Sequence, residues 1–215
     1  MTAGWGGETS EHLVPIAAGT TRATILAAAQ RLFGEKGYDA TSLRQIADAV
    51  GTTKAAVYYH FPAKEHLLLE LSRPWLDALG TLVTEMRRSA HGDGDGEAAA
   101  TLEAYLDVCI AHLAVLNLLA RDPATANHPD IGRRALTLIE AVKHHIAGED
   151  ASDDRLVHTS CAIGVVHAVA GLPADLVAAH RQTFLDSAIA ALNANERTPG
   201  AKRERQSSRR NVATQ

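Results

Sequence analysis

The sequence is poor in aromatic residues and has no long hydrophobic run. Phe, Trp and Tyr make up 4% of the 215 residues, whereas Ala and Leu are abundant, which favours helix over sheet. No apolar stretch approaches the roughly 20 residues that a membrane-spanning helix requires. The first 19 residues lack the basic start and apolar core of a secretory signal. We therefore expect a cytoplasmic protein with no membrane partner.

Cysteine is scarce, and the usual signatures of enzymes and metal sites are missing. Cys109 and Cys161 fall in apolar helical patterns, which predicts two buried, reduced thiols rather than a disulfide. His144 and His145 are adjacent, so on a helix they point about 100° apart and do not chelate from one face. Glu140 and His144 fit a solvated pair better than a metal site. No phosphate loop or nucleophile elbow is present, so we expect no metal, cofactor or enzymatic activity.

Charge is distributed unevenly along the chain. The formal net charge is −4, but residues 20–66 contain six Lys/Arg and four Asp/Glu. Residues 67–200 contain ten Lys/Arg and eighteen Asp/Glu. A mildly basic unit attached to an acidic body suits a protein that presents one face to a polyanion.

Hydrophobic periodicity predicts an all-α protein with about nine helices. No useful length of the chain alternates with a period of two, so we predict no sheet. We expect a Gly-rich flexible arm at 1–19, a DNA-binding domain at 20–66, a ligand-binding and dimerisation domain at 67–194, and a disordered basic tail at 195–215. The helical patterns cover approximately residues 20–36, 41–50, 53–60, 63–89, 98–120, 130–147, 152–171 and 173–194.

Residues 41–64 have the organisation of a helix-turn-helix DNA reader. Two short helical patterns flank Gly51, which permits a tight turn, and Pro62 cannot continue the second of them. The second of these patterns opens at Thr53, so its first residues are suited to enter the major groove of DNA. Tyrosine hydroxyls one turn further on are able to donate to phosphates.

Residues 32–68, LFGEKGYDATSLRQIADAVGTTKAAVYYHFPAKEHLL, resemble the DNA-binding signature of the TetR family of transcriptional regulators. The agreement includes Phe-x-x-x-Gly-Tyr at 33–38, the Ile-Ala pair, the Gly turn and Tyr-Tyr-His-Phe followed by Lys-Glu. The resemblance implies that Thr41 and Ser42 hold a phosphate at the start of the second helix. It implies base contacts for Thr53, Lys54 and Ala55, and mainly phosphate contacts for Tyr58, Tyr59, His60 and Lys64.

The resemblance also implies a homodimer on a palindromic double-stranded operator, with repression as the usual mode of regulation. We expect the last two helices to supply the dimer interface, through Leu156, Ile163, Gly164, His167, Leu176, Phe184, Leu185 and Ile189. The alternative is that these helices only complete the core of one subunit.

A small, largely hydrophobic effector is expected in the middle helices. Binding pockets combine apolar bulk with a few polar groups. The candidate lining residues are Trp75, Leu79, Met86, Tyr105, Cys109, His112, Asn117, His145 and His167. Two alternatives stay open: a constitutive DNA-binding dimer without an effector, and a helical enzyme.

Overall fold

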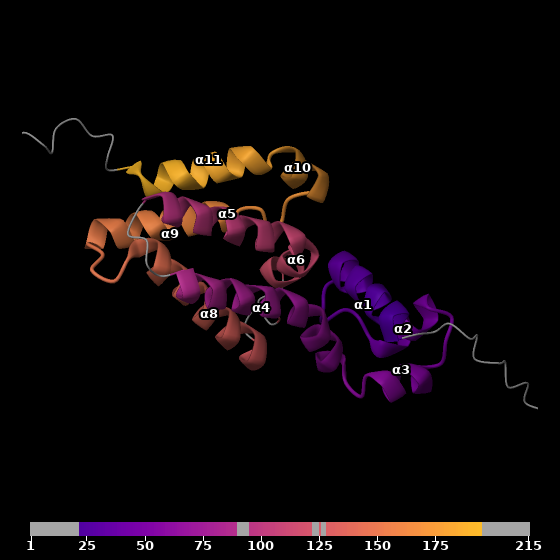
Figure 1. Ribbon diagram of the computed structural model, residues 1–215. Coiled ribbons are helices and arrows are strands. Elements are labelled where there is room, and N and C mark those ends of the chain that lie inside the picture. The colour runs from indigo at the N-terminus through magenta and orange to yellow at the C-terminus, as the bar shows by residue number, and fades with distance from the viewer. Residues whose placement is uncertain (1–21, 90–94, 122–124, 126–127, 195–215) are drawn as a thin grey trace, which may run out of the picture.

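The computed structural model describes residues 22–89, 95–121, 125 and 128–194, and within these ranges the chain forms helices and no strands (Figure 1). The prediction of an all-α protein is confirmed. Ten helices are described, against the roughly nine expected: α1 Arg22–Lys36, α2 Leu43–Ala49, α3 Lys54–His60, α4 Lys64–Ser89, α5 Asp95–Ala111, α6 Leu113–Arg121, α8 Pro129–Ala147, α9 Asp153–His167, α10 Ala174–Ala179 and α11 Arg181–Leu192. The predicted arm at 1–19 and tail at 195–215 lie outside the described residues.

Helices α1 to α3 form a small unit at one end of the molecule (Figure 1), here called the reading unit and comprising residues 22–61. Its core is built from the apolar faces of all three helices, with Ile25, Phe33, Ile46 and Val57 almost completely buried. Removal of these side chains from water is the main stabilising contribution to so small a unit.

Local hydrogen bonds set where the two short helices begin. The Ser42 hydroxyl accepts a hydrogen bond from the Gln45 backbone N–H, and the Gln45 side chain accepts one from the Ser42 N–H. This reciprocal capping box fixes the start of α2. Thr53 caps α3 by accepting from the Ala56 N–H at 3.1 Å. Gly51, at φ 70°, makes the turn between them in a conformation that glycine adopts without strain.

Helix α4 leaves the reading unit and runs into the body of the protein (Figure 1). It is 26 residues long and includes Pro74 in its interior. Arg22 on α1 forms an ion pair with Glu70 on α4, and its guanidinium lies 4.9 Å from the centre of the Phe61 ring. These contacts tie α1 to the first turns of α4.

The body contains two helix breaks that the sequence pattern did not predict. The single helix expected at 98–120 is two helices, α5 and α6, which meet at His112 with a bend of 79°. The bend turns α6 so that it packs on α1 and α4. The helix expected at 173–194 is also divided, into α10 and α11, at His180. Helix α9 ends at His167, before the expected Gly171.

Within the described residues, no single helix has both the length and the apolar composition that a membrane crossing requires. The bent pair α5 and α6 meets the requirement only when the two are taken together.

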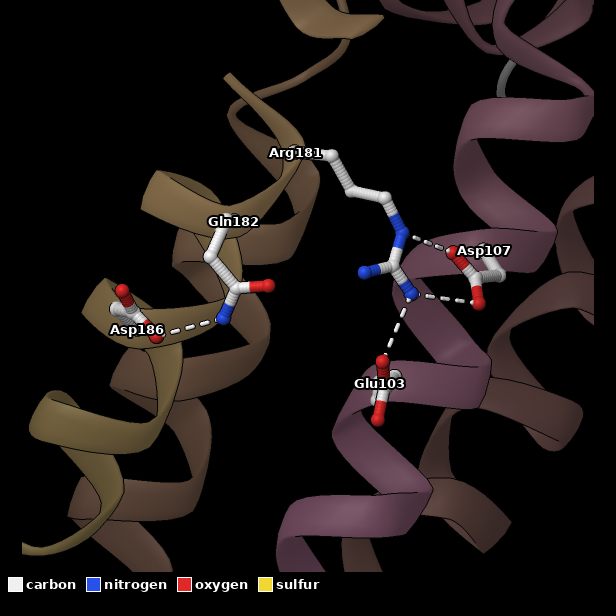
Figure 2. A network of polar contacts seen from close by, with 5 residues as sticks. All are labelled: Glu103, Asp107, Arg181, Gln182 and Asp186. Atoms are coloured by element: carbon white, nitrogen blue, oxygen red, sulfur yellow. Dashed lines mark hydrogen bonds and ion pairs between the residues drawn. The ribbon is translucent and has the colours of Figure 1, made fainter. Parts of the chain in front are cut away.

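Helix α11 packs along α9 and is also held to α5 by a polar network (Figure 2). The Arg181 guanidinium donates to both carboxylate oxygens of Asp107, at 2.7 and 2.8 Å, and to Glu103 at 3.0 Å. A bidentate contact of this kind fixes the orientation of the guanidinium relative to the carboxylate as well as the distance between them. It aligns the first turn of α11 on α5 just after the break at His180.

Candidate nucleic-acid interface

Helix α3 presents a polar and aromatic surface to the solvent. Tyr59 is 85% exposed and Tyr58 is 43% exposed, although both are large side chains. Lys54 and Ala55, at the start of the helix, are exposed as well. The Lys54 amine lies 5.2 Å from the centre of the Tyr58 ring, within the range of a cation–π contact. Large exposed aromatics beside a cation are unusual on a surface that contacts only water.

An open groove of about 350 Å³ lies between α2, α3 and the start of α4. Its lining brings together four of the predicted DNA contacts, Ser42, Lys54, Tyr58 and Lys64. It also contains Arg44, which the sequence prediction omitted. Arg44 is exposed in the structure. The sequence signal for this was its position outside the apolar stripe of α2, which indicates a solvent-facing cation. Three cations and one carboxylate, that of Glu65, line this groove, so its formal charge is positive and favours phosphate.

Thr41 does not occupy the position predicted for it. The side chain is 2% exposed, and its hydroxyl donates to the backbone carbonyls of Gly37, at 2.8 Å, and Leu32, at 3.2 Å. Because the hydroxyl is directed into the protein, the side chain is not presented to a phosphate. The prediction of a phosphate contact by Thr41 is therefore corrected, and the residue instead fixes the turn between α1 and α2.

Ser42, Thr53 and His60 are placed where a contact is possible. Ser42 and Thr53 are exposed, although the hydroxyl of each is also engaged in capping its helix. His60 is half-buried, and its ring lies edge-on to that of Tyr59, with 5.2 Å between the ring centres. The ring thus supports the exposed Tyr59 side chain from one side.

Five of the predicted effector contacts lie in the core of the body. Trp75, Leu79, Met86, Tyr105 and Cys109, from α4 and α5, are each less than a tenth exposed. Burial raises the pKa of the Cys109 thiol to about 12, so it is protonated and unreactive near neutral pH.

Tyr105 reaches from this core to His167, an exposed residue of α9. The Tyr105 hydroxyl lies 2.6 Å from Nε2 of His167. Burial, and secondarily the charge of Lys143, lowers the pKa of His167. His112, at the break between α5 and α6, also has its pKa lowered by burial.

The remaining predicted effector residues are engaged elsewhere. The Asn117 side-chain oxygen accepts a hydrogen bond from the Gly171 N–H at 2.5 Å and so ties α6 to the turn after α9. His145 lies 3.4 Å from Glu97 and lines a separate open cavity of about 820 Å³ beside Ser152 and Arg155. No other predicted effector residue lines that cavity.

The predicted dimer residues divide into exposed and buried sets. Leu156 and Leu176, both 43% exposed, and Gly164 face the solvent, whereas Phe184 and Ile189 are half-buried. His167 turns its ring to Tyr105.

Three predictions for α9 and α11 are wrong at the level of single residues. Ile163 and Leu185 are 2% and 5% exposed, because they pack in the core of one subunit, and they are corrected as interface residues. Cys161, expected to be buried, is exposed on α9 and is a free thiol. The outward face of α9 is therefore formed by Leu156, Val157, Cys161 and Gly164.

Comparison with known proteins identifies the reading unit. Residues 25–71 match the profile of the bacterial regulatory proteins of the tetR family. The chain is 40% identical over 73 residues to the HTH-type transcriptional regulator AcrR of Shigella flexneri, a match that covers 34% of each protein. It is 43% identical over 58 residues to the HTH-type transcriptional repressor KstR2 of Rhodococcus jostii, covering 27% of this chain and 28% of KstR2. These matches span about a third of the curated relatives.

Solved structures resemble the fold over a longer part of the chain. AmtR of Mycobacterium smegmatis superposes with a TM-score of 0.62 and 21% identity, covering 83% of this chain and 89% of AmtR. A TetR-family transcriptional regulator from Bordetella parapertussis gives a TM-score of 0.58 at 20% identity, covering 77% of this chain and 94% of its own. At these identities the likeness concerns the fold.

Proposed function

We propose that the chain is a DNA-binding transcriptional regulator, because residues 25–71 match the profile of the bacterial regulatory proteins of the tetR family. Its reading unit binds double-stranded DNA through α2 and α3. The observation that carries this proposal is the surface of α3, on which Tyr59 is 85% exposed next to the cationic groove that contains Arg44 and Lys54. A solvated helix has no need of this combination, whereas a phosphate-lined groove is complementary to it.

The N-terminal end of α3 enters the major groove in this proposal. Thr53, Lys54 and Ala55 face the bases, and the small Ala55 side chain lets the backbone approach closely. Tyr58, Tyr59 and His60 contact the sugar-phosphate backbone, as do Ser42 and Arg44 from α2. Base contacts provide sequence discrimination, and phosphate contacts fix the orientation of the helix.

The functional unit is a homodimer on a palindromic operator. One seven-residue helix contacts too few bases for useful specificity, and two-fold symmetry doubles the site. The outward face of α9, with Leu156, Val157, Cys161 and Gly164, supports this assignment. Gly164 has open space around its Cβ position, which permits the close approach of a second helix.

A small hydrophobic effector that binds between α4 and α5 controls DNA affinity in this proposal. The region is apolar, and the buried Trp75 Nε1 and Ser72 hydroxyl have no hydrogen-bond partner among the described residues. An acceptor on the effector would satisfy the indole N–H. A ligand of this kind shifts DNA affinity only by its preference for one of two arrangements of the dimer.

The coupling between effector and reading unit runs along α4 and α6. Helix α4 continues from the reading unit into the body, and Arg121 at the end of α6 donates to the Gly34 carbonyl of α1 at 3.3 Å. Repression with release by effector is the mode we propose. A constitutive DNA-binding dimer is the second candidate, and it would leave the unpaired groups at Trp75 and Ser72 without a function.

Selection of DNA duplexes from a randomised pool by the full-length protein tests both the DNA-binding function and its control by an effector. The proposal predicts enrichment of an inverted repeat bound by two subunits, and weaker binding to it when apolar compounds are screened against the complex. Failure to enrich any sequence would contradict the DNA-binding function. Enrichment with no response to any compound would instead favour the constitutive dimer.

A further inference from the structure

Lys64 carries its charge at a position where the helix itself disfavours it. It is the first residue of α4, and the N-terminus of a helix has a partial positive charge that repels a cation. The amine turns away from this end of the helix. It donates to the carbonyl oxygen of Tyr38 at 2.8 Å and lies 3.5 Å from that of Asp39. The negative ends of two backbone dipoles therefore receive the charge.

The turn that accepts Lys64 is packed on both sides. Tyr38 is 7% exposed, and its ring lies edge-on to Phe33 with 5.1 Å between the ring centres. The Lys64 amine is 4.1 Å from the centre of the Tyr38 ring, so the lysine binds both the ring and the carbonyl of one residue. Thr41 holds the same turn from within through the carbonyls of Gly37 and Leu32.

These contacts join the two ends of the DNA-reading segment. The turn leads directly into Ser42, the cap of α2, and α3 ends at His60, shortly before α4 begins. Lys64 thus connects the chain before α2 with the chain after α3. A side chain that closes this segment restricts how α2 and α3 tilt on the rest of the protein.

We propose that Lys64 is a positioning residue that clamps the 37–42 turn onto α4 and holds α2 and α3 in their docking orientation, instead of neutralising a phosphate. The inference rests on the proposed DNA-binding function. It assigns the phosphate contacts of the groove to Arg44 and to the exposed tyrosines, while Lys54 faces the bases.

The salt dependence of DNA binding separates a clamp from a phosphate contact. Each neutralised phosphate contributes about 0.9 to the slope of log affinity against log salt. On the duplex selected by the wild-type protein, Lys64→Met is expected to lower affinity about tenfold at every salt concentration, with an unchanged slope. Arg44→Met, which removes a proposed phosphate contact of the same groove, is the control and is expected to flatten the slope by about 0.9. Lys64→Arg is expected to restore most of the affinity, because a guanidinium also donates to carbonyls.

Flattening of the slope by about one unit in Lys64→Met would overturn the inference while leaving the proposed function intact. A second measurement needs no DNA. Hydrogen–deuterium exchange of the free protein should be faster at residues 37–42 in Lys64→Met and in Tyr38→Leu than in the wild type, at a temperature where thermal unfolding curves show each variant folded. Unchanged exchange in both variants would also overturn the clamp.

Discussion

The buried Tyr105 of α5 contacts the exposed side chain of His167 on α9, and partial desolvation affects the protonation of the histidine. Partial burial, and secondarily the charge of Lys143, lowers the pKa of His167, and its Nε2 lies 2.6 Å from the Tyr105 hydroxyl. In the unfolded chain the pKa returns to about 6.5. Below that pH the unfolded chain binds more protons than the folded one, so stability falls as the pH falls.

The thermal midpoint is therefore expected to decrease between pH 7 and pH 5, and His167→Gln should reduce that decrease by a few degrees. Glutamine retains a polar group for Tyr105 but does not titrate. If the thermal midpoints of His167→Gln and the wild type change identically with pH, His167 does not contribute to the pH dependence of stability.

Single residues also mark the limit of prediction from the sequence. The family resemblance implied a phosphate contact for Thr41, but the direction of its hydroxyl depends on carbonyls at Leu32 and Gly37. Arg44 was omitted because its participation depends on the groove that α2, α3 and α4 form together. Local patterns predict which residues are polar, and tertiary packing decides which way they point.

Helix boundaries were predictable where a cap or a glycine marks them. Ser42, Thr53 and Gly51 define α2 and α3 in the structure as the sequence indicated. The breaks at His112 and His180 were missed, since neither position carries a glycine or proline and both adjoin helix-compatible residues. Packing of α6 on α1 and the Arg181 contacts to α5 hold the bent arrangements (Figure 2), and such distant contacts have no local signature.

The face of α9 gives a prediction at the level of the helix. Gly164→Leu should improve helix propensity by about 1 kcal/mol, and the new Cβ meets open space within the subunit. In the proposed dimer the same side chain would separate two closely packed helices. We therefore expect a folded protein with an unchanged or raised thermal midpoint that is monomeric in sedimentation experiments.

Gly80 on α4 serves as the control for this substitution. A Cβ added there also meets open space, but the position lies away from α9, so Gly80→Leu should leave the dimer intact. A dimer that persists in Gly164→Leu would show that the α9 face is not the subunit interface.

The reading unit and the face of α9 proposed for dimerisation lie in different parts of the molecule (Figure 1). Figure 1 shows α1 to α3 at one end and the layer of α5, α9 and α11 at the other, with α4 running between them. Helix α4 and the contact of α6 with Gly34 connect the body to the reading unit, and they form the proposed route by which an event in the body alters the reading unit. The similarity to these curated regulators covers about a third of their length. Control by a ligand is therefore a proposal for this chain and does not follow from the similarity.

The most direct test is a titration of the selected duplex with Lys54→Ala and Tyr59→Ala. Each removes an exposed side chain of α3 that has little contact with the core, so both variants should fold like the wild type. Arg133→Ala, an exposed cation on α8, is the control and should bind normally. The account predicts affinity about tenfold weaker or worse for both α3 variants, with altered base preference for Lys54→Ala. Wild-type affinity in both would contradict the assignment of α3 as the DNA-reading helix.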